Sequence, residues 1–222
     1  MKIIEQSVEV IYPRTIGQGV QELKDIEAAG RNCYDSSNRS TDKSYGPFVR
    51  NLLANGHESP VEFGFIKFKI VTSRDVMAEL TRHRIASFCI RSQRYVDESE
   101  YGDIEFIKPL FYKDRPDDPF HAYDDVRFAA SMTWQDTMEN IEQAYKHLRD
   151  IGMRNEDARK VLPNSTATTI FMACNLRELL HIYDLRSAKA AYPEMRECMR
   201  LLKVEVDKVL PGFLPDDEEG KT

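Results

Sequence analysis

The chain has 222 residues, of which 41% are hydrophobic and 31% charged, and its formal net charge at pH 7 is −6. A chain of this size can bury one substantial core, and no stretch approaches the roughly 18 consecutive apolar residues that a membrane-spanning helix needs. The negative charge argues against nucleic acid as the main partner. We therefore expect a soluble, single-domain protein that binds neither a nucleic acid nor a membrane.

The first part of the chain predicts one strand, then two helices and a second strand. The patterns place these elements at residues 2–11, 19–34, 47–56 and 61–71. The apolar residues of the second strand change phase near Gly64, which predicts a β-bulge there. Ser73 is suited to cap a helix that runs into Arg82, with Asp75 in its first turn.

The second half predicts mostly helices around one further strand. Helices are expected over residues 121–150, in a short segment capped by Asn155, over about 175–186 and in a final segment. The Thr-rich segment 165–173 is expected to be a strand. The final helix has apolar residues at spacings of four and three, a pattern typical of a buried stripe: Met195, Met199, Leu202, Val206 and Val209.

These elements together predict an α/β (α+β) fold with a central, mostly antiparallel sheet flanked by helices. We expect a single domain over residues 1–215, followed by a disordered acidic tail at 216–222.

The N-terminal residues and the cysteines indicate the compartment. Glu5 interrupts the apolar run that a signal peptide would need, so no secretory export is indicated. The four cysteines, Cys33, Cys89, Cys174 and Cys198, lack the spacing of metal ligands or of redox pairs. We expect a cytoplasmic protein with reduced thiols and no metal site.

The most informative feature of the sequence is a run of cationic residues. Arg82-His83-Arg84 is followed after seven residues by Ser92, and then by Gln93-Arg94-Tyr95. Burying an unpaired charge costs far more than an apolar side chain returns, so the run predicts a site for an anion. Taken alone, Arg82 and Arg84 would only complement a helix dipole, which contributes some tenths of a kcal/mol each.

A second cationic group lies on the predicted helix near residue 180. Arg177 and His181 are four residues apart on one face, a spacing that is most often solvated. Arg186 lies nine residues after Arg177, half a turn away at about 100° per residue. One helix would thus direct its arginines at two places, which suits a site shared between subunits.

The run Arg82-His83-Arg84, seven residues, Ser92 and Arg94-Tyr95 resembles the signature of the flavin-dependent thymidylate synthases. This family methylates dUMP with FAD, methylenetetrahydrofolate and NADPH. Other blocks of the chain are similar to family segments in the same order, and the resemblance covers roughly residues 20 to 200. They are Arg31-Asn32-Cys33-Tyr34, Gly56 to Glu62, Arg159 before Val161-Leu162-Pro163, and Asn175-Leu176-Arg177 through His181 to Leu185-Arg186.

The resemblance implies a role for each matching residue. The positions that it assigns to the nucleotide are Glu79, Arg82, Arg91, Ser92, Gln93, Arg94, Arg159 and Arg186. The positions that it assigns to FAD are His57, Ser59, Arg82, His83, Arg84, Asn175, Arg177 and His181.

Within these sets, the resemblance gives Arg94 and Arg159 to the phosphate and assigns catalysis to Arg186 and Ser92. Arg186 would face the uracil ring, where a fixed positive charge stabilises the charge that develops in the reaction. The resemblance also implies NADPH and methylenetetrahydrofolate as co-substrates, and a homotetramer with active sites at its interfaces.

The chain departs from the family pattern at two places. Ile90 and Arg91 stand where many members have an acid or an amide, and Tyr192-Pro193 replaces part of the family's Ala-Gln-Trp-Glu. Two alternatives stay open. One is a divergent homologue that modifies another pyrimidine nucleotide or uses another one-carbon donor, and the other is a non-catalytic nucleotide-binding protein whose arginines only hold phosphate.

Overall fold

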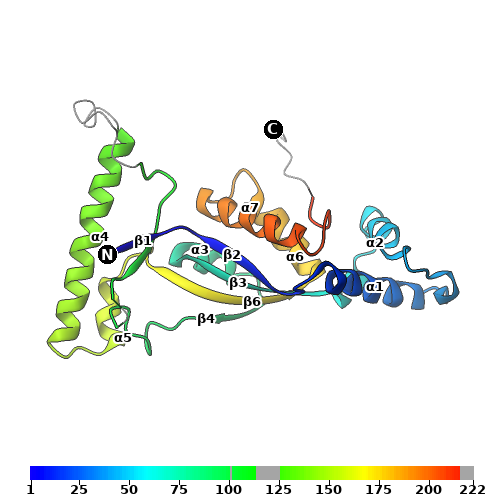
Figure 1. Ribbon diagram of the computed structural model, residues 1–222, viewed down its shortest axis with the longest axis horizontal. Coiled ribbons are helices and arrows are strands. Elements are labelled where there is room, and N and C mark those ends of the chain that lie inside the picture. Colours follow the sequence, from blue (N-terminus) through cyan, green and yellow to red (C-terminus); the bar gives the residue numbers. More distant parts are fainter. Residues whose placement is uncertain (101, 114–125, 216–222) are drawn as a thin grey trace. The chain divides into compact units, whose positions relative to one another are not determined.

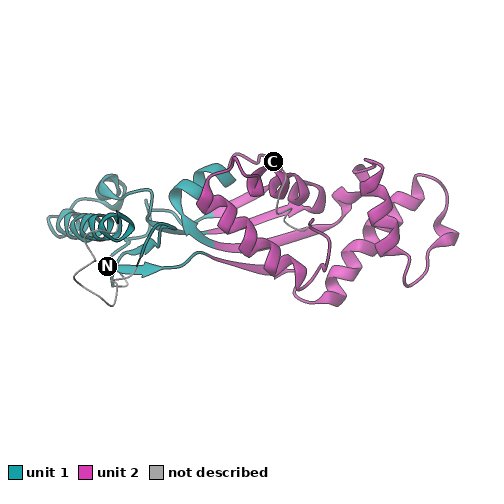
Figure 2. Ribbon diagram, turned by 90° about the horizontal axis from the view of Figure 1, so that it is seen from above, with its two compact units in different colours: residues 1–6, 71–80, 90–169 teal, residues 7–70, 81–89, 170–222 magenta. Residues whose placement is uncertain are grey.

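The computed structural model describes residues 1–100, 102–113 and 126–215. The predicted tail at 216–222 and the start of the predicted helix at 121–125 lie outside the described residues. The chain divides into two compact units, each built from separated segments (Figure 2). Unit 1 contains residues 1–6, 71–80 and 90–169, and unit 2 contains residues 7–70, 81–89 and 170–222.

A four-stranded sheet has the order β2-β3-β6-β4 (Figure 1). Its strands are β2 (Ser7–Tyr12), β3 (Phe65–Ser73), β6 (Ala167–Asn175) and β4 (Ser87–Ile90). The N–H of Leu176 donates to the carbonyl of Gly64 and the N–H of Arg74 donates to that of Asn164, both at 2.8 Å. The start of β3 therefore meets the end of β6, and the predicted antiparallel sheet is confirmed.

The strand predicted over residues 2–11 is wrong as one element. Its first part, β1 (Lys2–Ile4), pairs in parallel with β5 (Glu105–Ile107) in unit 1, whereas its second part is β2. Gln6 lies between the two strands. Its side-chain Oε1 accepts a hydrogen bond from Thr72 Oγ1 at 2.7 Å. Both parts have strand propensity, so the sequence pattern alone did not separate them.

The described part of unit 2 contains four α-helices, of which α7 lies along the sheet (Figure 1). They are α1 (Ile16–Asn32), α2 (Tyr45–Ala54), α6 (Leu176–Ser187) and α7 (Pro193–Asp207). Helix α7 packs on β2 and α6, and it buries Met195, Met199, Leu202 and Val206 completely. The predicted apolar stripe is thus confirmed as core. No helix in the described ranges is long and apolar enough to cross a membrane.

The segment before β3 also differs from the prediction. Residues Ser59–Phe63 form the 3-10 helix η2, so β3 begins only at Phe65 and Gly64 is not a bulge. A Cβ added at Gly64 would lie 2.8 Å from Leu176 Cδ1 and 2.9 Å from Ile26 Cδ1. Glycine is required here because side chains of α1 and α6 pack against its α-carbon, not because of a change in strand phase.

Unit 1 contains helices α3 (Arg74–Leu80), α4 (Val126–Asp150) and α5 (Asn155–Ala158), with a 3-10 turn, η4, at Arg159–Val161. Helix α3 ends before Arg82, and Ser73 precedes it with its hydroxyl donating to the Asp75 carboxylate. The predicted Asn155 cap is wrong, because Arg154 is the capping residue and Asn155 is the first residue of α5. The core of unit 1 consists of Ile104, Phe106, Met138, Tyr145 and Ala158.

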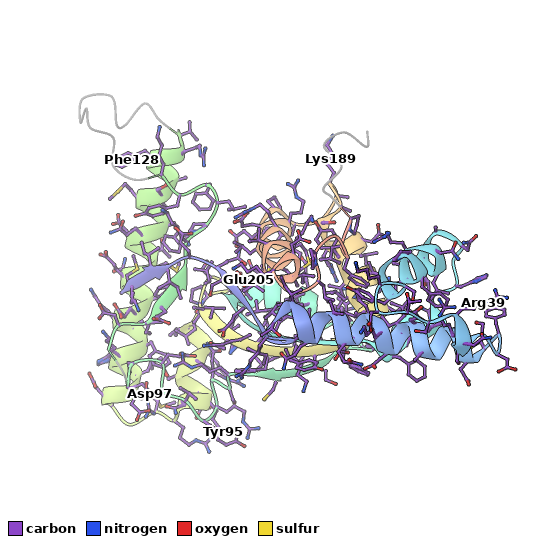
Figure 3. All side chains as sticks on the ribbon, turned by 45° about the vertical axis from the view of Figure 1, so that its right-hand side comes forward. Arg39, Tyr95, Asp97, Phe128, Lys189 and Glu205 are labelled. Atoms are coloured by element: carbon purple, nitrogen blue, oxygen red, sulfur yellow. The ribbon has the colours of Figure 1, made fainter. Side chains whose placement is uncertain are left out.

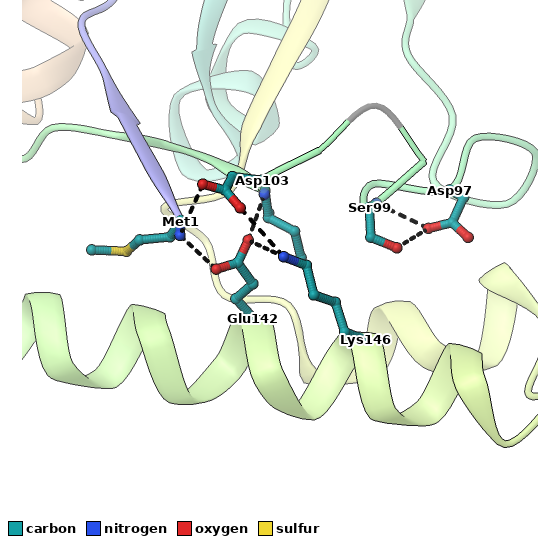
Figure 4. Close-up of polar contacts among 7 residues, drawn as sticks. Met1, Asp97, Ser99, Asp103, Glu142 and Lys146 are labelled. Atoms are coloured by element: carbon teal, nitrogen blue, oxygen red, sulfur yellow. Dashed lines mark hydrogen bonds and ion pairs between the residues drawn. The ribbon is translucent and has the colours of Figure 1, made fainter.

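A buried carboxylate ties α4 to the β1 end of unit 1 (Figure 4). Glu142, only 8% exposed, accepts the Ile104 N–H at 2.8 Å and lies 2.6 Å from the Met1 ammonium and 3.1 Å from Lys146 Nζ. Burial alone would raise the pKa of Glu142. The hydrogen bonds from the Met1 ammonium, the Ile104 amide and Lys146 outweigh burial and hold this pKa below its usual value.

Replacing Glu142 by Gln is expected to lower the free energy of unfolding at pH 7 by about 1–3 kcal/mol, because the Met1 ammonium and Lys146 lose an ionised partner. A carboxyl group with a depressed pKa stabilises the fold above its unfolded pKa, and the contribution is lost as the pH falls through the folded pKa. The difference between the two proteins should therefore shrink from pH 7 to pH 3 in urea unfolding. Glu139→Gln, on the exposed face of α4, is the control, and an equal difference at both pH values would contradict the assignment.

Candidate functional site

Three blocks that are far apart in the sequence meet around one pocket in unit 2. The pocket has a volume of about 600 Å³, and residues of η2, of the segment after β3 and α3, and of α6 line it. The lining residues are Glu58, Glu62, Ile85, Asn175, Arg177, Glu178, Leu180, His181 and Asp184. Three of the predicted flavin residues, Asn175, Arg177 and His181, are therefore brought together.

A second pocket of about 400 Å³ in unit 2 contains two more of the predicted flavin residues, His57 and Ser59. Cys33 and Tyr34 at the end of α1 also line it, so the Arg-x-Cys-Tyr element reaches the same region. Glu58 and Arg177 border both pockets and so connect them.

Arg177 is oriented by two carboxylates of η2. Its Nε donates to Glu58 Oε2 at 3.1 Å and its Nη1 donates to Glu62 Oε1 at 2.5 Å. These hydrogen bonds, first the one to Glu62 and then the one to Glu58, hold the pKa of Arg177 above its usual value. Sequence reasoning included both glutamates in a motif but did not identify them as partners of Arg177.

His83 is buried, with 6% of its surface exposed, although its neighbours Arg82 and Arg84 are exposed. Its Nε2 accepts a hydrogen bond from Arg186 Nε at 3.0 Å, and its Nδ1 lies 3.5 Å from Glu178 Oε1. Burial, followed by the nearby Arg186 and His181, lowers the pKa of His83 to about 4. The imidazole is therefore neutral near pH 7.

The residues predicted to bind the nucleotide phosphate lie in unit 1. Arg94 Nε is 3.4 Å from a carboxylate oxygen of Glu156, and Arg159 Nε donates to the backbone carbonyl of Glu156 at 3.3 Å. The two predicted phosphate arginines thus converge on one residue. Ser92 shapes the turn, because its hydroxyl accepts the N–H of Arg94 at 3.2 Å.

Glu98 organises the rest of this region, and sequence reasoning missed it. Its buried carboxylate lies 3.0 Å from Arg91 Nη2 and close to the Gln93 side chain. Burial raises the pKa of Glu98 despite these cationic and polar neighbours. Arg74 interacts electrostatically with the same group of charged residues. Burial lowers the pKa of Arg74, and the charges of Arg159 and Arg91 lower it further.

The loop that carries Glu98 is fixed to α4. The N–H of Glu98 donates to the hydroxyl of Tyr145 at 3.2 Å, and Arg149 Nε donates to Asp97 Oδ2 at 2.8 Å. Figure 3 labels Tyr95 and Asp97 on this loop, where Tyr95 is largely exposed. The residues between Arg91 and Glu98 are therefore held at both ends by buried or half-buried partners.

The predicted substrate residues divide between the two units. Glu79 lies half-buried on α3 in unit 1, whereas Arg82 and Arg186 belong to unit 2. No group of three or more His, Cys, Asp or Glu side chains in the described ranges is arranged to hold a metal ion.

Comparisons with known proteins identify the family of the chain. Residues 18–212 match the family described as thymidylate synthase complementing protein. The chain belongs to the flavin-dependent thymidylate synthase family. The predicted resemblance and the prediction that the chain is an enzyme are thereby confirmed.

Two relatives within this family show the extent of the match. A probable flavin-dependent thymidylate synthase of Mycobacterium phage L5 is 33% identical over 200 residues, which cover 86% of this chain and 78% of the relative. The flavin-dependent thymidylate synthase of Nitratidesulfovibrio vulgaris is 31% identical over 211 residues, which cover 86% of this chain and 80% of the relative.

Solved structures show the same fold. The UMP/dUMP methylase PolB from Streptomyces cacaoi bound with 5-Br dUMP has a TM-score of 0.74 and 23% identity, covering 95% of this chain and 94% of that one. The structure of the same methylase bound with 5-Br UMP has a TM-score of 0.73 and 21% identity. The predicted α/β fold class is therefore confirmed by structures as well as by the family match.

Arg177 should be nearly dispensable for stability. Arg177, Glu58 and Glu62 are each almost half exposed, and exposed ion pairs contribute little because solvent screens them. We expect Arg177→Met to leave the midpoint of urea unfolding of the flavin-free protein nearly unchanged. Arg200→Met on α7, an exposed arginine paired with Glu197, is the matched control. A loss several times larger than that of the control would show that Arg177 is mainly structural.

Proposed function

We propose that this chain catalyses the reductive methylation of dUMP to dTMP, with FAD as its flavin, NADPH as reductant and methylenetetrahydrofolate as carbon donor. The observation that carries the proposal is one pocket in unit 2 lined by Glu58 and Glu62, by Ile85 of the segment after Arg84, and by residues between Asn175 and Asp184. Membership of the family supplies the expectation that such a pocket serves a flavin.

The residues present fit a flavin. A volume of about 600 Å³ is in the range that small ligands occupy, and Ile85 and Leu180 provide apolar surface while Asn175 and Arg177 provide polar groups. Several carboxylates also line the pocket, which suits an uncharged ring system better than a diphosphate.

The diphosphate of FAD requires cationic partners outside this carboxylate-rich lining. Arg82 and Arg84 are exposed guanidiniums of unit 2 and are suited to it, and His57, Ser59, His83 and His181 complete the proposed flavin residues. When bound, FAD would supply hydride chemistry, accepting a hydride from NADPH and passing it to the pyrimidine.

The proposed nucleotide residues have complementary tasks. Arg94 and Arg159 would bind the phosphate, because the planar guanidinium fork matches phosphate oxygens. Arg91, Ser92 and Gln93 form the turn that carries Arg94, with Glu98 holding Arg91 in place. We also propose that Glu79 and Arg82 contact the nucleotide.

Arg186 is proposed to act on the pyrimidine by charge. A fixed guanidinium close to the ring stabilises the negative charge that develops as carbon 5 becomes nucleophilic. The buried thiols are unsuited to a covalent alternative, since burial raises the pKa of Cys174 and of Cys198 to about 12. These two groups remain protonated near neutral pH and would be poor nucleophiles.

We further propose that residues 1–215 form the catalytic region and act in the cytoplasm as a homotetramer with shared active sites. Arg177 contacts η2 while Arg186, half a turn further around α6, contacts His83. One helix thus serves two different places, as a shared site would require.

A second candidate activity concerns the pyrimidine. Ile90 stands where the family pattern leads us to expect an acid or an amide. The neighbouring Arg91 forms an ion pair with Glu98. A changed environment at this turn favours testing UMP and dCMP beside dUMP. The solved protein of similar fold is named as a UMP/dUMP methylase.

The direct test is the purified protein itself. We expect it to be yellow, with non-covalently bound FAD, and to convert dUMP, methylenetetrahydrofolate and NADPH to dTMP and tetrahydrofolate. Omission of any reductant should stop turnover after one flavin equivalent, because the folate would then donate carbon only. Stoichiometric dihydrofolate, measured by chromatography, would contradict this mechanism. A colourless protein that does not take up FAD would contradict the proposal as a whole.

Variants separate charge stabilisation from covalent catalysis. Arg186→Ala should lose at least about a hundredfold in kcat, because the preorganised charge near the ring is removed. Ser92→Ala should keep measurable turnover, and Cys89→Ser should remain active. Complete inactivity of Cys89→Ser, with folding and flavin content retained, would instead support covalent attack by its thiolate.

A further inference from the structure

The catalytic arginine proposed above is held by a buried imidazole. Arg186 Nε donates to His83 Nε2 at 3.0 Å, and the other ring nitrogen of His83 lies 3.5 Å from Glu178 Oε1. All three residues belong to unit 2, and Glu178 and Arg186 lie on the same helix, α6. The three side chains therefore form one continuous series from a carboxylate to a guanidinium.

The direction of the hydrogen bond between Arg186 and His83 is fixed by chemistry. The Nε–H of arginine can only donate, so His83 Nε2 must carry a lone pair. A neutral imidazole then has its proton on Nδ1, and this proton faces Glu178 Oε1. The glutamate oxygen must accept, because a donor at this position would face another donor.

The burial of Glu178 requires an explanation. Its side chain is 6% exposed, and a buried carboxylate is costly unless it has partners. Burial raises its pKa, and the nearby His181 acts in the opposite direction. Glu178 is also the third residue of α6, where its N–H donates to the Asn175 side chain. A capping role would turn the carboxylate back toward Asn175, yet Glu178 Oε1 faces His83.

We propose that Glu178 and His83 are positioning residues for Arg186: Glu178 stabilises the Nδ1–H tautomer of His83 from the side opposite Arg186, and His83 fixes the plane of the guanidinium. The contact with His83 uses the Nε–H and limits rotation about the Cδ–Nε bond, so the terminal nitrogens keep one direction. The catalytic value of this direction rests on the proposed function, whereas the tautomer and the hydrogen bond do not.

The neutrality of His83 is part of the arrangement. The titratable and charged groups described as facing it are Glu178, His181 and Arg186, all from α6. Burial favours the neutral imidazole. Arg186, which is cationic, and His181, which can become cationic, favour it as well. Protonation would remove the lone pair that accepts from Arg186, so the arrangement persists only above the pKa of His83.

A nitrogen-15 NMR experiment on the flavin-free protein tests the tautomer without any assay of activity. The His83 resonances, assigned by their loss in His83→Gln, should show a protonated Nδ1 and an unprotonated Nε2 from pH 8 to pH 6. Glu178→Gln keeps an oxygen acceptor and should keep this tautomer, whereas Glu178→Leu should give a mixture. A protonated Nε2 in the unaltered protein, or no change in Glu178→Leu, would overturn the proposal.

Kinetics then distinguishes positioning from a purely structural role. Glu178→Leu should lower kcat about 10- to 100-fold, because a misplaced catalytic group costs rate. Its KM for dUMP should change far less, and Glu178→Gln should recover most of the rate; kcat is expressed per bound flavin because Glu178 lines the pocket proposed for the flavin. Glu197→Leu, which removes a carboxylate from α7, is the control and should leave kcat unchanged.

The decisive comparison uses Arg186→Lys, which has no Nε–H to donate to His83. If Glu178 acts through Arg186, adding Glu178→Leu to Arg186→Lys should cause little further loss of kcat. An equal loss in both backgrounds would show that Glu178 only supports the fold. If the unaltered protein makes no dTMP, the proposed function fails, while the NMR result still decides the hydrogen-bond series.

Discussion

The backbone hydrogen bond from Leu176 to Gly64 connects the two segments on which the pocket of unit 2 depends. It joins the end of η2 to the start of α6, and it sets the antiparallel register of β3 and β6. Because of this register, Glu58 and Arg177 meet although they are 119 positions apart in the sequence. Close approach of the two segments is possible because Gly64 has no side chain to occupy the space taken by Leu176 and Ile26.

Carboxylates accompany the cations that define the site. Arg177 contacts Glu58 and Glu62, while in unit 1 Arg91 contacts Glu98 and Arg94 contacts Glu156. These partners hold long, flexible side chains in defined directions, which reduces the conformational entropy that a ligand must remove on binding. They also compete with an anionic ligand, so binding requires each arginine to exchange or share its carboxylate.

The sequence predicted elements well where a local pattern determines them. The apolar spacing of α7 and the Asn175 cap of α6 are local signals, and both elements formed close to the predicted residues. The 3-10 helix at Ser59–Phe63 was missed because its alternating apolar residues imitate a strand. The break between β1 and β2 was missed because it depends on pairing with β5, which lies about a hundred positions away.

In the candidate site, too, local patterns were predicted and long-range contacts were not. The cationic residues were identified by their motif, but their partners depend on contacts that only the folded chain creates. Glu98 lies in an acidic run, Asp97-Glu98-Ser99-Glu100, which is typical of a solvated loop. Glu178 follows Asn175 at the spacing of a capping residue, so no sequence pattern indicates that its carboxylate faces a histidine.

The interleaving of the two units has a consequence for synthesis on the ribosome. The last segment of unit 1 ends at residue 169, and the last segment of unit 2 begins at residue 170. Strand β3 is therefore made about a hundred residues before β6, its neighbour in the sheet, and the nascent chain presents β3 with one unpaired edge for that interval. Lys67 and Lys69 alternate along its exposed face, and charges of this kind discourage pairing between neighbouring nascent chains.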